Sequence, residues 1–261
     1  MNMNTFLLAF IFTLIAGLAT VFGAFIVFIT NQHNYRILAA GLGFSAGAMI
    51  YISFVEILPQ AISGFEKMFP SYGEILGICG FFIGVILSAF LDRLVPQEYN
   101  PHEPHEKANS SSLQRIGLMS AIAIGVHNFP EGFATFVSTF ESPTFGLMIA
   151  IAIAIHNIPE GMAVALPVYH SSGSYKKAIL YSALSGIAEP LGAMVGALII
   201  FPLFGDISVS VAFALIAGVM VFISLDELLP SAREYGKSHD SLYGLFLGMA
   251  VMAVSLVMLK M

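Results

Sequence analysis

Long apolar runs follow one another along almost the whole chain and are separated by short polar breaks. Each run has around 20 residues, which is the length that an α-helix needs to cross a bilayer. The first run, from Phe6 to about Thr30, is too long for the core of a signal peptide and has no basic residue before it. We therefore expect it to be the first membrane-spanning helix.

This pattern predicts an all-α polytopic membrane protein with eight transmembrane helices, which form a single transmembrane domain over residues 1–261. The expected helices are residues 5–30, 36–61, 72–93, 114–140, 144–169, 175–203, 208–230 and 241–260. The short alternating segments of a transmembrane β-barrel are not found. One connection is long: residues 94–113 are rich in proline and polar residues, and we expect a mobile cytoplasmic loop there.

The composition agrees with a protein that lies in the lipid bilayer. Hydrophobic residues make up 57% of the chain and charged residues 10%, with a mean hydropathy of +0.87, whereas soluble domains have about 25% charged residues. The formal net charge is −6 and no basic stripe exists, so a nucleic-acid partner is excluded. With Cys79 as the only cysteine, no disulfide framework can form.

Lysine and arginine residues gather on one side of the predicted helices. In or beside the loops of that side are Arg36, Arg93, Lys107, Arg115, Lys176, Lys177, Arg233 and Lys237. Only Lys67 and Lys260 fall on the other side. Because loops rich in lysine and arginine stay in the cytoplasm, we expect both termini to lie outside the cytoplasm.

Two segments of the chain repeat one another. AGAMIYISFVEILP, residues 46–59, and AGVMVFISLDELLP, residues 217–230, are identical at eight of fourteen positions. The first lies in a helix expected to run outward, and the second in a helix expected to run inward. We therefore predict that helices one to three and six to eight form an inverted repeat around the central pair of helices four and five, a common construction in secondary transporters.

The motif HNFPEG, residues 127–132, recurs as HNIPEG, residues 156–161, on the next helix. Within each copy, the histidine and glutamate are four residues apart and share one helix face. Because consecutive helices are antiparallel, the two clusters can meet near the middle of the bilayer, where the sixth helix adds a glutamate. The seven polar side chains are His127, Asn128, Glu131, His156, Asn157, Glu160 and Glu189.

Three carboxylates around one point repel each other and lack water in the bilayer. A divalent cation would supply the opposite charge, and imidazole, carboxylate and amide groups are its usual ligands. The alternative is that the histidines and asparagines only hydrogen-bond the helices together. The repetition of the motif with three acids favours an ion site, because ionisable groups inside a membrane are costly and usually functional.

The paired HNFPEG and HNIPEG motifs, with Glu189 on the next helix, resemble the signature of the ZIP (Zrt/Irt-like) divalent metal transporter family. The resemblance covers nearly all of the chain. It implies a transporter and not an enzyme, located in the bacterial inner membrane, with no cofactor. It also implies uptake of zinc into the cytoplasm by alternating access, and in some members a homodimer. The mixed ligands predict loose selectivity that extends to iron, manganese, cobalt and cadmium.

The resemblance also implies roles for single residues. His127, Glu131 and Glu160 would form a primary metal site, and Asn128, Asn157 and Glu189 would complete a neighbouring one, with both motif glutamates bridging. His156 would be an added ligand or a gate residue. A side chain of helix two contributes in the family, and Met49 is the candidate here, as a soft thioether ligand.

Acidic residues on helices two and seven suggest a path to and from this site. Glu56 lies toward the outer end of helix two and could capture the ion, whereas Asp226 and Glu227 lie toward the inner end of helix seven and could receive it. They could equally be charges at helix ends near water. His102 and His105 in the 94–113 loop could bind metal weakly, although a solvated linker explains them nearly as well.

Two other functions remain open at this stage. A histidine and a glutamate four residues apart on a helix resemble half of a catalytic zinc site, as in an intramembrane zinc hydrolase, but the HExxH motif is absent. A divalent cation channel or an exporter could be built on the same site.

Overall fold

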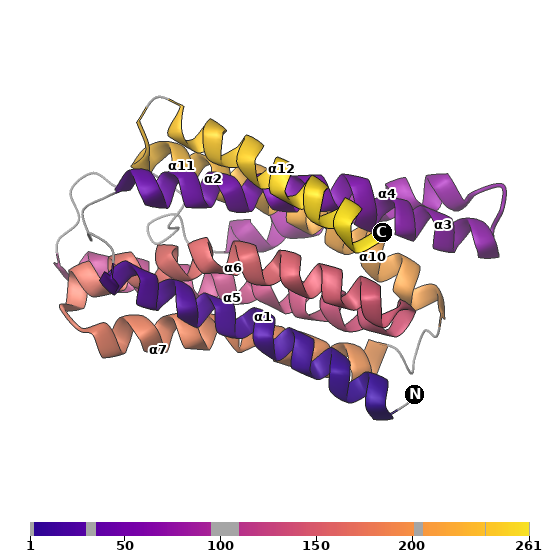
Figure 1. Cartoon of the computed structure of the whole chain (residues 1–261), viewed down its shortest axis with the longest axis horizontal. Coiled ribbons are helices and arrows are strands. Elements are labelled where there is room, and N and C mark those ends of the chain that lie inside the picture. The colour runs from indigo at the N-terminus through magenta and orange to yellow at the C-terminus, as the bar shows by residue number, and fades with distance from the viewer. Residues whose placement is uncertain (1–2, 30–34, 95–109, 201–205, 238, 261) are drawn as a thin grey trace.

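The computed structural model describes residues 3–29, 35–94, 110–200, 206–237 and 239–260, and these residues form helices without strands. The helices lie side by side in two layers (Figure 1). The first layer contains α2 (Tyr35–Ile52), η1 (Ser53–Ile57), α3 (Leu58–Met68), α4 (Gly73–Leu94), α10 (Asp206–Ile223), η4 (Ser224–Leu228), α11 (Leu229–Tyr235) and α12 (Asp240–Lys260). The second contains α1 (Met3–Ile29), α5 (Ser110–Glu141), α6 (Pro143–Ser172), α7 (Tyr175–Gly186), α8 (Ala188–Val195) and η3 (Gly196–Ile200).

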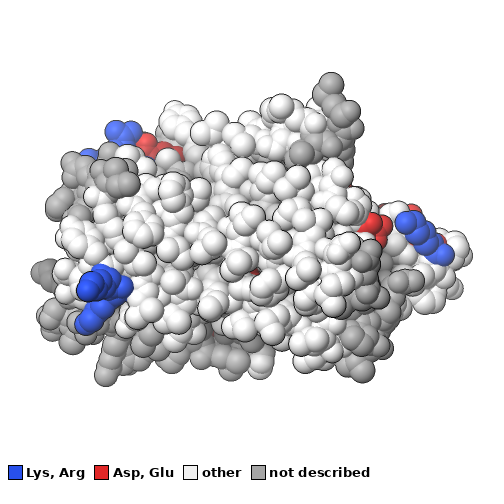
Figure 2. Space-filling model, turned by 60° about the horizontal axis from the view of Figure 1, so that its bottom comes forward, with Lys and Arg blue, Asp and Glu red and all other residues white. Residues whose placement is uncertain are grey.

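The lengths and apolar character of the helices fit a membrane. In the described part of the chain, seven helical segments are long and apolar enough to cross a bilayer. The eighth long helix is α5, which carries the HNFPEG motif, and its span stays a prediction. The first helix begins and the last helix ends at the same end of the bundle (Figure 1). On the face in Figure 2, charged side chains lie near the two ends, and the wide middle is almost free of them.

Two predicted helix ends are wrong. The helix predicted at 36–61 continues through η1 and α3 to Met68, and the one predicted at 208–230 continues to Tyr235. The added turns carry exposed charged residues such as Lys67 and Arg233, so a search for apolar runs ends too early. The segment predicted as a loop, 94–113, overlaps α5, which begins at Ser110. Residues 95–109 of that segment lie outside the described residues, and the loop stays a prediction.

The two repeated segments adopt the same local conformation. Each contains a π-helical turn, at η1 and at η4, and a proline follows in the first turn of the next helix. In both copies a serine hydroxyl donates to the carbonyl four residues earlier: Ser53 to Met49 and Ser224 to Met220, each at 2.7 Å. This match supports the sequence repeat, while the inverted arrangement of the two halves stays a prediction.

Within each layer, glycines allow the backbones of neighbouring helices to touch. Gly161 of α6 lies directly against the backbone of Thr20 in α1, and Gly47 of α2 against that of Leu245 in α12. Among the described glycines, only Gly41 faces the other layer, and it contacts a proline side chain of α6 instead of the backbone. Neighbouring helices of one layer therefore pack with their backbones in direct contact, whereas side chains fill the space between the layers.

Candidate metal centre

The two motifs meet because α5 and α6 form a tight antiparallel pair. Only Ser142 separates the helices. Its hydroxyl accepts a hydrogen bond from the N–H of Phe145 at 3.2 Å, and Pro143 occupies the first helical turn of α6, so α6 begins as soon as α5 ends. The motifs HNFPEG and HNIPEG consequently lie at similar depths on neighbouring helices.

Glu131, His156 and Glu160, which come from the two motifs, form a compact buried group. One potential ligand atom from each side chain lies within 4.8 Å of the other two. Nε2 of His156 is 3.3 Å from Oε1 of Glu131. The exposed fractions of the three residues are 1%, 1% and 2% in chain order. Two carboxylates and an imidazole at this spacing form a ready set of ligands for a divalent cation.

Ser45 of α2 reaches the same group from the other layer. Its hydroxyl lies 3.4 Å from Oε1 of Glu160 and 3.4 Å from the carbonyl oxygen of His156. Sequence reasoning missed this residue. The available signal was that Ser45 is a small polar residue in an apolar helix, one turn before Met49.

Asn157 and Glu189 form a second buried pair beside this group. The amide of Asn157 donates to Oε1 of Glu189 and, at 2.9 Å, to the carbonyl oxygen of Ala16 in α1. Glu189 is fully buried in the first turn of α8. The helix before it ends at Gly186, and Ile187 connects the two. One asparagine therefore joins α6 to both α1 and α8.

Asn128 is held in a similar way on α5. Its side-chain nitrogen donates to the carbonyl oxygen of Ser185 in α7 at 3.3 Å, and the residue is fully buried. Because both asparagines use their N–H groups on neighbouring helices, their amide oxygens are left as acceptors without a hydrogen-bond partner among the described residues.

Several other buried oxygens in this region also lack a hydrogen bond within the described chain. They are both carboxylate oxygens of Glu131 and Oε2 of Glu189. A buried acceptor without a partner costs about 1–3 kcal/mol, and more when it is charged. A cation satisfies such oxygens directly, since carboxylate and amide oxygens are hard ligands. The donor set therefore fits one or more divalent ions better than it fits hydrogen bonds alone.

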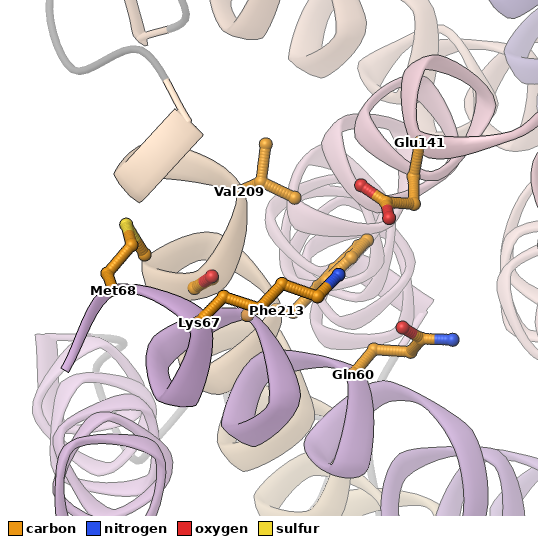
Figure 3. A pocket seen from close by; sticks show the side chains of 8 residues that line it. Gln60, Lys67, Met68, Glu141, Val209 and Phe213 are labelled. Atoms are coloured by element: carbon orange, nitrogen blue, oxygen red, sulfur yellow. The ribbon is translucent and has the colours of Figure 1, made fainter. Parts of the chain in front are cut away.

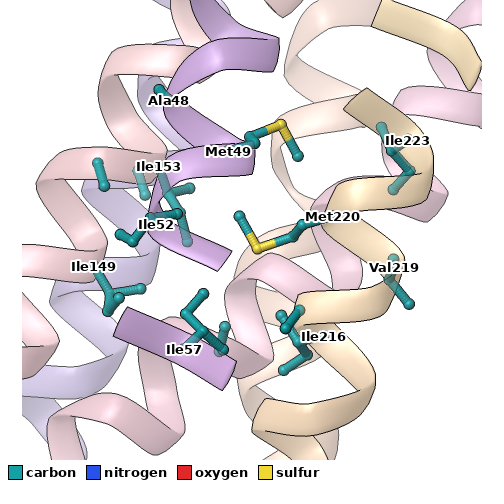
Figure 4. Close-up of a cluster of buried hydrophobic side chains, with 14 of the residues drawn as sticks. Ala48, Met49, Ile52, Ile57, Ile149, Ile153, Ile216, Val219, Met220 and Ile223 are labelled. Carbon is teal, nitrogen blue, oxygen red and sulfur yellow. The ribbon is translucent and has the colours of Figure 1, made fainter. Parts of the chain in front are cut away.

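The remaining predicted ligands are placed as follows. His127 lies in α5, but its side chain is outside the described residues. Met49 is fully buried in an apolar cluster that also contains Met220, Ile52 and Ile153 (Figure 4). The structure therefore places its thioether among hydrophobic side chains, and its role as a ligand stays a prediction.

The path residues lie at the π-helical turns. Glu56 of η1 and Glu227 of η4 are buried, whereas Asp226 is exposed. None of the three belongs to the compact group around Glu131. His102 and His105 lie outside the described residues. The roles of all five stay predictions.

Comparison with known proteins decides the family. The sequence model of the ZIP zinc transporter family matches residues 93–256 of this chain, which include the whole of the buried group. The chain belongs to the ZIP family. Its curated relatives include proteins named zinc transporter ZupT from Campylobacter jejuni, 51% identical over 97% of this chain and 96% of the relative, and from Streptococcus mutans, 51% identical over 96% and 97%. A third, from Oceanobacillus iheyensis, is 50% identical over 98% of this chain and 100% of the relative.

Membership in the ZIP family settles the class of the protein. It is a multi-pass membrane transporter rather than an enzyme, and the prediction from the paired motifs is confirmed. The intramembrane hydrolase is therefore excluded by the family.

Proposed function

We propose that this chain carries zinc ions across the bacterial cytoplasmic membrane into the cytoplasm, with Glu131, His156 and Glu160 as the central transport site. The relatives named zinc transporters align with nearly the whole chain. The observation that carries the proposal is the burial of this group at 1–2% exposure. Two acids and an imidazole inside a membrane protein are costly without a cation.

The neighbouring polar residues supply oxygen ligands for a second ion beside the first. Asn128 and Asn157 have amide oxygens free to accept, and Glu189 contributes a carboxylate oxygen. Glu131 and Glu160 would bridge the two ions, and His127 would add an imidazole to the first. Because the asparagines are anchored to α1 and α7, both positions belong to the layer that contains α5 and α6.

The two-layer construction supports transport by alternating access. Close backbone contacts hold α1 and α6 together in one layer and α2 and α12 together in the other. Across the layers, the site is closed by a side chain, Ser45, through hydrogen bonds of 3.4 Å. We infer that the layer with α5 and α6 carries the ion and shifts against the other layer, so that α1, α7 and α8 move with the central pair.

The distribution of charge supports an orientation and a path for the ion. Eight of the ten lysine and arginine residues lie on one side of the predicted spans, and this supports an orientation with that side in the cytoplasm and both termini outside. Glu56 would then receive the ion on the outer half, and Glu227 with Asp226 on the inner half. The inverted relation of η1 and η4 would give the two sides equivalent acidic positions.

We propose that zinc is the main transported ion and that the protein also transports other divalent metals. The ligands are nitrogen and oxygen atoms without a cysteine, and this set accepts Fe(II), Mn(II), Co(II) and Cd(II) as well. A homodimer stays a prediction from the family resemblance.

Zinc flux tests the proposal directly. Bacterial cells that lack their own zinc importers should accumulate radioactive zinc when they produce this chain, and purified chain in lipid vesicles should give flux that saturates with zinc concentration. Loss of cellular zinc would indicate an exporter. Flux that follows voltage without saturation would indicate a channel, and the absence of flux in both systems would overturn the proposal.

A further inference from the structure

A pocket opens between the two layers at the end of α5. Its volume is about 280 Å³, and its polar lining consists of Gln60 and Lys67 of α3, Ser210 of α10 and Glu141 of α5. In Figure 3 the Lys67 side chain points across the pocket toward Glu141. With the orientation proposed above, this is the outer end of the bundle. The pocket therefore lies where an ion from outside would reach the boundary between the layers.

A line of polar side chains runs along α5 from this pocket to the metal centre. Glu141, Ser138, Thr135 and Glu131 follow one another at spacings of three, three and four residues, so they share one face of the helix. The ten residues from Glu131 to Glu141 span about 15 Å at 1.5 Å per residue, which is half of the hydrocarbon thickness of a bilayer. We call Thr135 and Ser138 the α5 hydroxyl pair.

The α5 hydroxyl pair is buried but makes no hydrogen bond. Both residues are 0% exposed, and neither hydroxyl oxygen has a partner among the described residues. Thr139, next to them and equally buried, behaves differently because its hydroxyl donates to the carbonyl of Thr135 at 2.7 Å. A buried hydroxyl without a partner is unfavourable, so packing alone does not account for the pair.

The facing part of α6 offers no alternative polar route. From Phe145 to Ile153 it contains only apolar residues and one glycine. On the α5–α6 pair, the polar side chains between the pocket and Glu131 therefore all come from α5. Hydroxyl oxygens are neutral ligands suited to a divalent cation that has lost part of its hydration shell.

We propose that the α5 hydroxyl pair forms the outer half of the ion route. A hydrated divalent cation enters the pocket beside Glu141, exchanges water for the hydroxyl oxygens of Ser138 and then Thr135, and arrives at Glu131. The steps along the helix axis are about 4.5–6 Å each, close enough for transfer from one ligand to the next. This inference rests on the proposed function and adds the residues that deliver the ion to its site.

The test compares transport with binding in the double variant Thr135→Val and Ser138→Ala. Zinc uptake into vesicles should fall by about 10-fold or more, because the route loses both oxygens. Equilibrium zinc binding to the purified variant should stay as in the unsubstituted protein, since the central site is untouched. Thr139→Val is the matched control and should keep full uptake. Thr135→Ser, which keeps the hydroxyl, should also keep uptake.

The other outcomes overturn the inference in distinguishable ways. If the double variant transports zinc at the full rate while the unsubstituted protein is active, the hydroxyl pair is not on the route and the proposed function still stands. If zinc binding is lost together with transport, the pair belongs to the packing of the metal centre. If the unsubstituted protein carries no zinc, the proposed function itself fails.

Discussion

Zinc uptake should fall more than about 100-fold when Glu131 or Glu160 is changed to glutamine. The substitution keeps the size of the side chain but removes one negative charge and one ligand oxygen from a buried group whose members lie within 4.8 Å of one another. Loss of groups that only support metal ligands already costs 10–100-fold in affinity or activity, and a direct ligand should cost more. The measurement is the initial rate of uptake into vesicles with matched protein content.

An exposed glutamate provides the control for these variants. Glu74 in the first turn of α4 is exposed, so Glu74→Gln should transport zinc at the unsubstituted rate. Uptake at the full rate by both Glu131→Gln and Glu160→Gln would contradict the proposal that these residues form the transport site.

Gly132→Ala should destabilise the protein strongly, whereas Gly125→Ala on the same helix should not. A Cβ atom at position 132 would overlap the backbone of Glu189, while at position 125 the nearest atom, Cα of Ser185, is 3.8 Å away. Overpacking typically costs about 1–3 kcal/mol, and rigid backbone cannot move aside. At an open helical position, alanine is instead favoured over glycine by up to about 1 kcal/mol.

Thermal unfolding in detergent measures this difference. The Gly132→Ala variant should unfold at a clearly lower temperature than the unsubstituted protein, and Gly125→Ala at the same or a slightly higher one. Because Glu189 belongs to the metal centre, Gly132→Ala should also weaken zinc binding. Equal unfolding temperatures for the two variants would mean that α5 and α8 do not pack as closely as described.

The sequence was sufficient to predict an all-helical membrane protein and the meeting of the two motifs. Backbone polar groups must be satisfied within a helix in a bilayer, so apolar runs translate directly into spanning helices. The Ser142 turn is short, so α5 and α6 had to be neighbours, and the spacing within HNFPEG and HNIPEG then fixed which side chains could meet. The two motifs do meet, with Glu131, His156 and Glu160 close together. The sequence reasoning had instead grouped His127 with the two glutamates and made His156 an added ligand or a gate residue, and this assignment of ligands stays a prediction.

Contacts between layers were not predictable in the same way. Periodicity along α2 places Ser45 and Met49 on one face, but which of them reaches Glu160 depends on the rotation and crossing of α2 against α6. The structure selects Ser45 for that contact and places Met49 in the apolar cluster. Helix ends were also missed, because the last turn of α3 projects charged residues beyond the apolar run.

The most direct test of the central claim is anomalous X-ray scattering from crystals of the protein soaked in zinc. The account predicts an anomalous peak between α5 and α6, at about 2.0–2.2 Å from a nitrogen of His156 and from carboxylate oxygens of Glu131 and Glu160. A zinc-loaded crystal with no peak there, or with peaks only at the surface, would contradict it.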